Sequence, residues 1–148
     1  LCLLDPYGLD LNWAVIQTAG RMRSIDMFLN FPVHDMNRNV LWQNPDSVSH
    51  RQAKRLTAYW GDDSWRTAAY DTQWSLLGYE VKMDISAVVR AFQRRLMEVA
   101  GFKYVAEPLP FRNTRDALLY YLFFALQQPV AAEIVQDIFS KYRMRGVR

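Results

Sequence analysis

Two short apolar segments with a helical pattern between them set the strongest constraint on the fold of this chain. The segment Leu1–Leu4 is continuously apolar and ends in turn-forming residues, which is typical of a strand buried on both faces. Helical spacing of apolar residues follows over Trp13–Met22, with Asp10 or Asn12 as the candidate N-cap. The segment Ile25–Phe31 predicts a second strand. Strand, helix and strand within about thirty residues predict a βαβ unit with parallel strands.

The rest of the chain predicts several helices and a final hairpin. Helical patterns cover Asp35–Gln43, Ser47–Trp60, Asp62–Ala69, Ala87–Ala100 and Ala131–Tyr142. Ser86 is the candidate N-cap of the fourth of these helices. The last helix has apolar residues spaced to face a sheet: Ile134, Val135, Ile138 and Phe139.

The two strand-like segments Phe102–Leu109 and Leu118–Leu126 are separated by a short polar connection. That spacing predicts an antiparallel hairpin. Together with the βαβ unit, it predicts an α/β fold whose sheet begins parallel and ends in a hairpin, with helices packed on the sheet.

Composition and charge exclude several classes of protein. The formal net charge of +3 and the isoelectric point near 9.1 permit contact with nucleic acid without requiring it. Cys2 is the only cysteine, and His34 and His50 lack a second ligand at metal-binding spacing, so neither a disulfide nor a metal site is predicted. No apolar stretch reaches the roughly 18 residues of a membrane-spanning helix, and the start lacks the charge of a signal peptide. These patterns predict a cytoplasmic protein.

Polar and aromatic residues follow the first strand of the predicted βαβ unit. In open α/β sheets, ligands bind beyond the carboxyl ends of the strands, which is where Asp5, Pro6 and Tyr7 lie. The Asp5 carboxylate and the Pro6 carbonyl can accept hydrogen bonds from the exocyclic amine of a base. Tyr7 can stack on that base, and Gly8 lets the backbone turn tightly beneath them. The alternative is a plain turn beside a core tyrosine.

Further candidates follow the second strand. Asn30, Phe31 and Pro32 end that strand at the same edge of the sheet and are candidate substrate contacts. Asn37 and Arg38 come next and either bind phosphate or a partner, or form a solvated surface pair. The helix expected over Ala87–Ala100 carries a basic stripe that either faces nucleic acid or is an ordinary solvated helix face. The stripe consists of Arg90, Arg94 and Arg95.

The turn after the first strand resembles a motif of a known enzyme class. The stretch LDPYG resembles the fourth motif of class I S-adenosylmethionine-dependent methyltransferases, whose amino-methylating members carry Asp or Asn, two prolines and an aromatic residue. Here a single proline precedes Tyr7, which departs from that pattern. Over nearly its whole length the chain resembles the three-Cys-motif partner proteins, a bacterial family with a methyltransferase-like fold. The segments that carry this resemblance are LLDPYGLDLNWAVI, IDMFLNFP, YWGDDSW and LLYYLFFAL.

The resemblance implies that residues 1–148 form the C-terminal half of a Rossmann-like methyltransferase sheet. The strands would be the fourth to the seventh of that sheet, the last one antiparallel, with a helical insertion around residues 35–100. The cofactor-binding half would lie upstream of Leu1, since the chain contains no Gly-x-Gly turn for S-adenosylmethionine.

The resemblance also implies a function. The chain would be a fragment, inactive alone, of an enzyme that transfers a methyl group from S-adenosylmethionine to an amino nitrogen, with a nucleobase as the expected acceptor. Asp5, Pro6 and Tyr7 would be catalytic, and substrate contacts would come from Gly8, Asn30, Phe31, Pro32, Asn37 and Arg38. The alternative is a non-catalytic partner protein that binds nucleic acid or another protein, such as one carrying a three-Cys motif. Neither interpretation includes a metal or a membrane.

Overall fold

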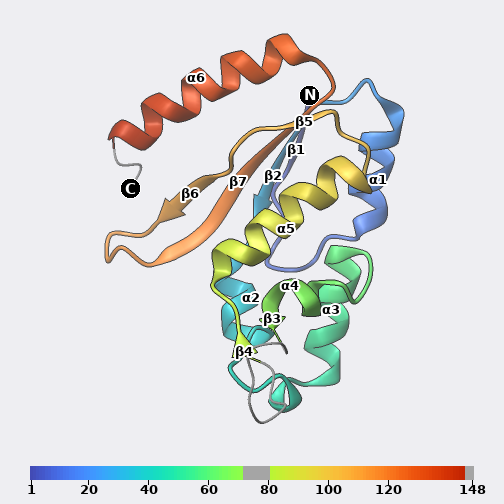
Figure 1. Ribbon diagram of the computed structural model, residues 1–148, viewed down its shortest axis with the longest axis vertical. Helices are drawn as coiled ribbons and strands as arrows, with labels where there is room; N and C mark the ends of the chain where they lie inside the picture. The colour runs from blue at the N-terminus through green and yellow to red at the C-terminus, as the bar shows by residue number, and fades with distance from the viewer. Residues whose placement is uncertain (72–80, 146–148) are drawn as a thin grey trace.

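The predicted βαβ unit is present, and its strands are parallel. The computed structural model describes residues 1–71 and 81–145. β1 (Cys2–Leu4) and β2 (Met27–Phe31) are parallel neighbours, and α1 (Trp13–Met22) connects them (Figure 1). Asn12 caps α1, because its side-chain oxygen accepts a hydrogen bond from the backbone N–H of Ala14 at 2.9 Å.

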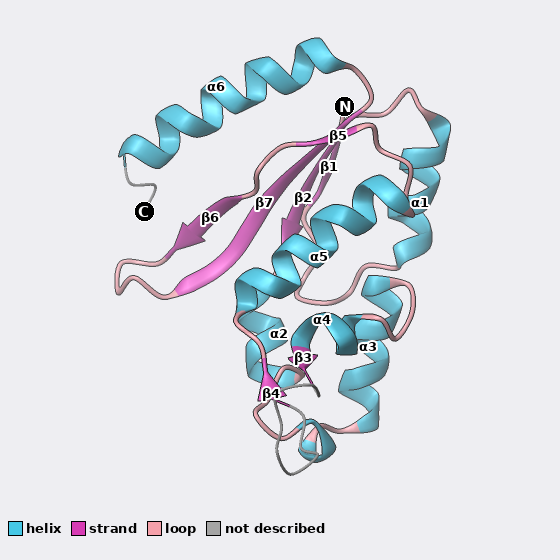
Figure 2. Ribbon diagram, in the orientation of Figure 1, coloured by secondary structure: helices cyan, strands magenta, loops and turns pink. Residues whose placement is uncertain are grey.

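The main sheet within the described residues has five strands. β7 (Leu118–Leu126) is antiparallel to β2, to β5 (Tyr104–Val105) and to β6 (Leu109–Arg112), so it runs opposite to its four companions (Figure 2). The predicted hairpin is confirmed, but the expected strand Phe102–Leu109 is divided between β5 and β6. Pro108 lies at the division, where a proline has no N–H to donate to the ladder.

The larger core packs helices against one face of the sheet. It joins β2 and β7 to α1, α3 (His50–Trp60) and α5 (Ile85–Glu98). Phe92 of α5 lies at its centre, and its ring centroid is 4.4 Å from that of Phe31 and 5.3 Å from that of Trp60. Alternate residues of β2 therefore point into this core, while the residues between them point to the other face.

A smaller core on the other face involves α6 (Pro129–Arg145), which contacts β7 and β5 (Figure 1). Val135 and Phe139 of α6 are buried in it. The prediction that Ile134 and Ile138 also face the sheet is wrong, since they are 57% and 42% exposed. Residues one position apart point about 100° apart around a helix, so the sheet covers only one of the two apolar rows.

The expectation that Leu1–Leu4 is buried on both faces is also wrong. Leu1 and Leu3 are 85% and 70% exposed. β1 is an edge strand of the sheet, and the described part of α6 packs on β5 and β7 rather than on β1. The face of β1 that carries Leu3 is therefore open among the described residues.

The expected helical region is largely confirmed within the described residues, although residues 72–80 lie outside them. Its further elements are α2 (Val33–Asn39), the 3-10 helix η1 (Pro45–Ser47), α4 (Trp65–Ala69) and a two-stranded sheet of β3 (Tyr70–Asp71) and β4 (Val81–Lys82). Ser49 caps α3, and Gly61 ends it with a left-handed φ of 103°. Asp84, rather than Ser86, caps α5, because the Asp84 carboxylate accepts from the backbone N–H of Ser86.

Candidate functional site

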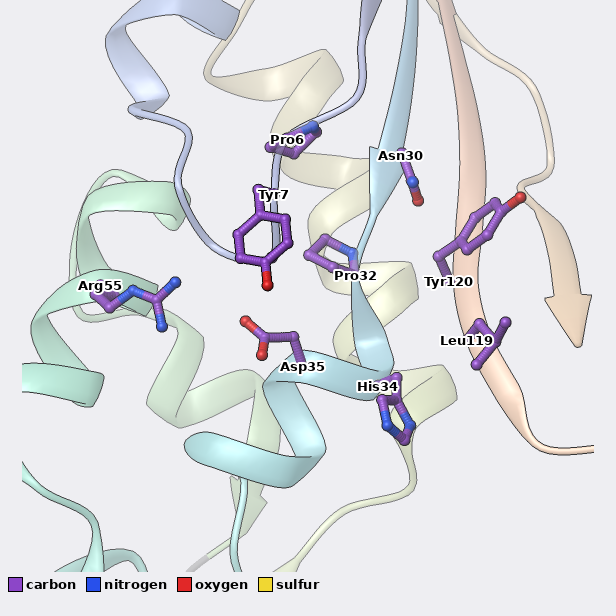
Figure 3. A pocket seen from close by; sticks show the side chains of 10 residues that line it. Pro6, Tyr7, Asn30, Pro32, His34, Asp35, Arg55, Leu119 and Tyr120 are labelled. Atoms are coloured by element: carbon purple, nitrogen blue, oxygen red, sulfur yellow. The ribbon is translucent and has the colours of Figure 1, made fainter. Parts of the chain in front are cut away.

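An open pocket of about 380 Å³ lies at the carboxyl ends of β1 and β2. The predicted residues that line it are Pro6, Tyr7, Gly8, Asn30 and Pro32. Parallel neighbouring strands end at the same edge of a sheet, and this brings the turn after β1 beside the end of β2 (Figure 3). The structure therefore brings these five residues together at the edge that the strand order predicts.

Asn30 and Asp5 join the ends of the two strands. The Asn30 amide nitrogen Nδ2 donates a hydrogen bond to Asp5 Oδ1 at 2.7 Å. A carboxylate only accepts, so this bond fixes which way the amide points. The remaining amide oxygen, Asn30 Oδ1, is buried and has no hydrogen-bond partner among the described residues. Asp5 does not itself line the pocket; it holds the residue that does.

Asp35, near the start of α2, supplies a second acceptor. Its Oδ1 accepts a hydrogen bond from the Asn39 side chain. Its Oδ2 is buried and has no hydrogen-bond partner within residues 1–71 and 81–145. Gly8 packs against this carboxylate with a left-handed φ of 57°, and a Cβ at position 8 would lie 2.5 Å from Asp35 Oδ2. Only glycine lets the turn approach the carboxylate so closely.

Arg55, from α3, closes the side of the pocket next to Gly8. Its Nη2 forms an ion pair with Asp10 at 3.0 Å, and its Nη1 donates to Gln52 at 3.0 Å. The bonds to Asp10 tie α3 to the loop that follows β1, while Gln52 lies on α3 itself. The guanidinium thus brings a positive charge beside an otherwise acceptor-rich wall.

Tyr7 lies at the mouth of the pocket and is 91% exposed. Its ring, the Asp35 carboxylate and the Arg55 guanidinium point toward one another across the opening (Figure 3). The alternative of a core tyrosine is therefore wrong. An exposed aromatic ring beside a pocket offers a stacking surface for a planar ligand.

The other candidate residues lie outside this pocket. Phe31 is fully buried in the larger core, because it points to the opposite face of β2 from Asn30. Asn37 accepts a hydrogen bond from Lys82 Nζ at 3.2 Å, at a separate surface hollow. Arg38 is exposed on α2, and its backbone carbonyl accepts from the indole N–H of Trp42.

Five lining residues were not predicted: His34, Asp35, Arg55, Leu119 and Tyr120. His34 and Asp35 follow Pro32 directly, so their position after the second strand is a signal that could have identified them. Arg55 comes from α3, and the last two come from β7. No local pattern in the sequence marks these three, because their place at the pocket depends on tertiary packing.

Comparisons with protein-family models, with curated proteins and with solved structures found no match to this chain. In the described part of the chain, no helix has the length and apolar character needed to cross a membrane. Among the same residues, no group of three or more His, Cys, Asp or Glu side chains is placed to hold a metal ion. The lining of the pocket offers oxygen acceptors, a guanidinium, the His34 imidazole and aromatic rings.

Proposed function

We propose that the pocket binds an amino group carried on a planar base and orients its nitrogen for methylation. The observation that carries this proposal is a pair of buried acceptor oxygens, Asn30 Oδ1 and Asp35 Oδ2, which no described donor satisfies. A buried acceptor without a partner costs about 1–3 kcal/mol, and a ligand N–H offsets that cost. A primary amino group has N–H donors to give, whereas a carbonyl at the same position only accepts.

Each of three residues in the turn after β1 has its own role in this proposal. Tyr7 stacks on the ring of the base at the mouth of the pocket, since its side chain is exposed there. Pro6 lines the wall and offers a carbonyl acceptor without a competing N–H of its own. Asp5 is a positioning residue, because it acts by holding the Asn30 amide.

The resemblance to amino-methylating enzymes makes methyl transfer the reaction class for this pocket, with S-adenosylmethionine as the methyl donor. The last strand, β7, is antiparallel to its neighbours, as that resemblance implies. The residues of this chain do not fit the cofactor itself: the turn after β1 holds Gly8 alone, the turn after β2 begins at Pro32, and the sequence has no Gly-x-Gly. We therefore assign to this chain the binding of the substrate only, and not the binding of the cofactor.

Titration with two nucleosides tests this function. Adenosine carries an exocyclic amino group where inosine carries a carbonyl, and the neighbouring ring nitrogen N1 accepts in adenosine but carries an N–H in inosine. We expect adenosine to shift NMR signals of the pocket residues and to bind at least about tenfold more tightly than inosine, because the inosine carbonyl cannot donate to the acceptors and faces them as a further acceptor. Asn30→Leu should remove this preference, while Asn37→Leu, an amide outside the pocket, should keep it. Equal affinity for both nucleosides in the unaltered protein would contradict the proposal.

A second candidate function is a non-catalytic binding module, and the exposed row on α6 favours it. Residues four apart on this helix form an apolar row that is at least 42% exposed throughout: Val130, Ile134, Ile138 and Tyr142. Glu133, Asp137 and Lys141 lie on one flank of the row, where Lys141 Nζ pairs with Asp137 at 2.6 Å. A second copy of α6 packed antiparallel would bury both apolar rows. Self-association through α6 is therefore the form that this alternative takes.

A further inference from the structure

We infer that cationic faces of α3 and α2 bind the phosphate backbone of a single-stranded nucleic acid whose base enters the pocket. This inference rests on the proposed function of the pocket, and it names the substrate as a polynucleotide rather than a free nucleoside. The inference is argued from the cations of α3, from Arg38 on α2 and from the exposed Tyr7 at the mouth of the pocket.

α3 has an unusual distribution of charge. The helix contains no acidic residue, and its cations Arg51, Lys54 and Arg55 lie three and four positions apart on one face. Arg51 lies in the first turn, where the N-terminus of the helix dipole is already positive. Such an arrangement is unfavourable by itself, and a bound anion makes it favourable.

The outer cations of α3 are free to take a ligand. Arg51 and Lys54 are exposed, and neither forms an ion pair with any residue in the described ranges. Arg55 uses three of its N–H groups on Asp10 and Gln52, which leaves others of its five donors available. The row of cations thus runs from the pocket wall at Arg55 outward along α3.

α2 adds one further cation, Arg38, which is exposed and lies one turn beyond the pocket residue His34 on the same face of the helix. The pocket wall holds Asp35 and Asn30, whose free oxygens suit an amino group rather than a phosphate. Phosphates at the rim and a base amino group inside match this separation of charge.

The exposure of Tyr7 favours a single strand. The Tyr7 ring is 91% exposed at the mouth of the pocket, where it can stack on a base that has left its neighbours. A base within a duplex reaches such a pocket only after it is unstacked and unpaired. The single strand therefore binds without that cost, and a duplex is the competing outcome of the test.

The other basic stripe, on α5, is less suited to this role. Arg95 Nη2 is 2.7 Å from Asp62 Oδ2, and the guanidinium carbon of Arg95 lies 4.7 Å from the ring centroid of Trp13. Arg95 therefore holds parts of the fold together. Arg90 and Arg94 remain exposed on α5 and offer a matched control for the charge of α3.

Fluorescence anisotropy with a labelled, mixed-sequence single-stranded DNA tests the inference on the full chain. The double variant Arg51→Glu/Lys54→Glu should weaken DNA binding about tenfold or more at low salt. The plot of the logarithm of the binding constant against the logarithm of the salt concentration should become less steep by about 1.4. Arg90→Glu/Arg94→Glu makes the same change in net charge, so it should alter the affinity by no more than about twofold. Circular dichroism verifies that both variants are folded.

Four results would overturn the inference: no binding of the single strand, normal binding by Arg51→Glu/Lys54→Glu, equal losses in both double variants, or tighter binding of a duplex. The nucleoside titration separates these failures from a failure of the pocket. If Arg51→Glu/Lys54→Glu binds DNA normally while adenosine is still preferred to inosine, the backbone site is wrong and the amino-binding pocket stands. If adenosine and inosine bind alike, the proposed function fails whatever the DNA result.

Discussion

Asn30 and Asp5 are joined by a hydrogen bond of 2.7 Å across the ends of two parallel strands, although 25 positions separate them in the chain. The bond uses the donor end of the amide of Asn30, a residue that lines the pocket, and leaves its oxygen buried without a described partner. A turn residue after one strand thereby sets the orientation of a pocket residue on the next.

Asp5→Ala should weaken adenosine binding about tenfold while leaving the fold intact. Without the carboxylate, the Asn30 amide is free to rotate and present N–H instead of oxygen to the ligand. The bond is exposed, so its loss changes stability by about 1 kcal/mol or less. Asp5→Asn keeps an acceptor and should bind adenosine better than Asp5→Ala. Unchanged affinity of Asp5→Ala for adenosine would show that Asp5 is a turn residue that does not position Asn30 for binding.

Gly8→Ala should destabilise the protein more than Gly101→Ala. Both glycines have left-handed φ values, 57° and 92°, so both substitutions carry backbone strain of about 1–2 kcal/mol. A Cβ at Gly8 also meets Asp35 Oδ2 at 2.5 Å, whereas a Cβ at Gly101 meets nothing closer than 3.8 Å. Urea unfolding of the two variants measures the difference. Equal losses of stability would mean that the turn does not press on the Asp35 carboxylate.

The cap of α5 should make stability depend on acid pH. Hydrogen bonds from the Ser86 side chain lower the pKa of Asp84 from its ordinary value of 3.8. The Asp84 carboxylate therefore stabilises the fold above its unfolded-state pKa, and this stabilisation is lost as the pH falls through the folded-state pKa. Asp84→Ala should cost about 1 kcal/mol at neutral pH. In urea unfolding, that difference should shrink in acid; a difference that stays constant would show that the cap does not titrate as described.

Ile134→Glu should abolish any self-association through α6 without lowering stability. Ile134 is 57% exposed, so the substitution buries no charge in the monomer, but it would bury one in the antiparallel pair. Gln136→Glu adds the same charge at another exposed position of α6 and should leave association unchanged. Light scattering over a range of protein concentrations measures the mass. A monomer at every concentration would remove the evidence for the second candidate function.

Much of the fold could be predicted because its signals are local. The apolar runs, the Asn12 cap and the polar connection before β7 each act over a few residues, and together they predict the βαβ unit and the hairpin. The exposure of Leu3 could not be predicted in this way, since burial of a strand depends on which elements cover it. Pattern recognition identifies a strand, but not its neighbours in the sheet.

The candidate site could likewise be predicted where its signals are local, but not where they depend on tertiary packing. The rule that ligands bind at the carboxyl ends of strands correctly grouped Gly8 with Asn30 at one pocket. It did not separate Asn30 from Phe31, although the alternation of side chains along β2 was enough to do so. Arg55 and Tyr120 could not be found from the sequence, because they reach the pocket from α3 and β7.

In the proposed complex, the pocket receives an amino group against Asn30 and Asp35. Adenosine labelled with nitrogen-15 at its amino group allows this to be measured directly, by nuclear Overhauser contacts from the amino protons to the protein. We expect contacts from those protons to Gly8 and to the side chain of Asn30, with the base ring against Tyr7. Amino protons that contact only solvent, with the ribose in the pocket instead, would contradict it.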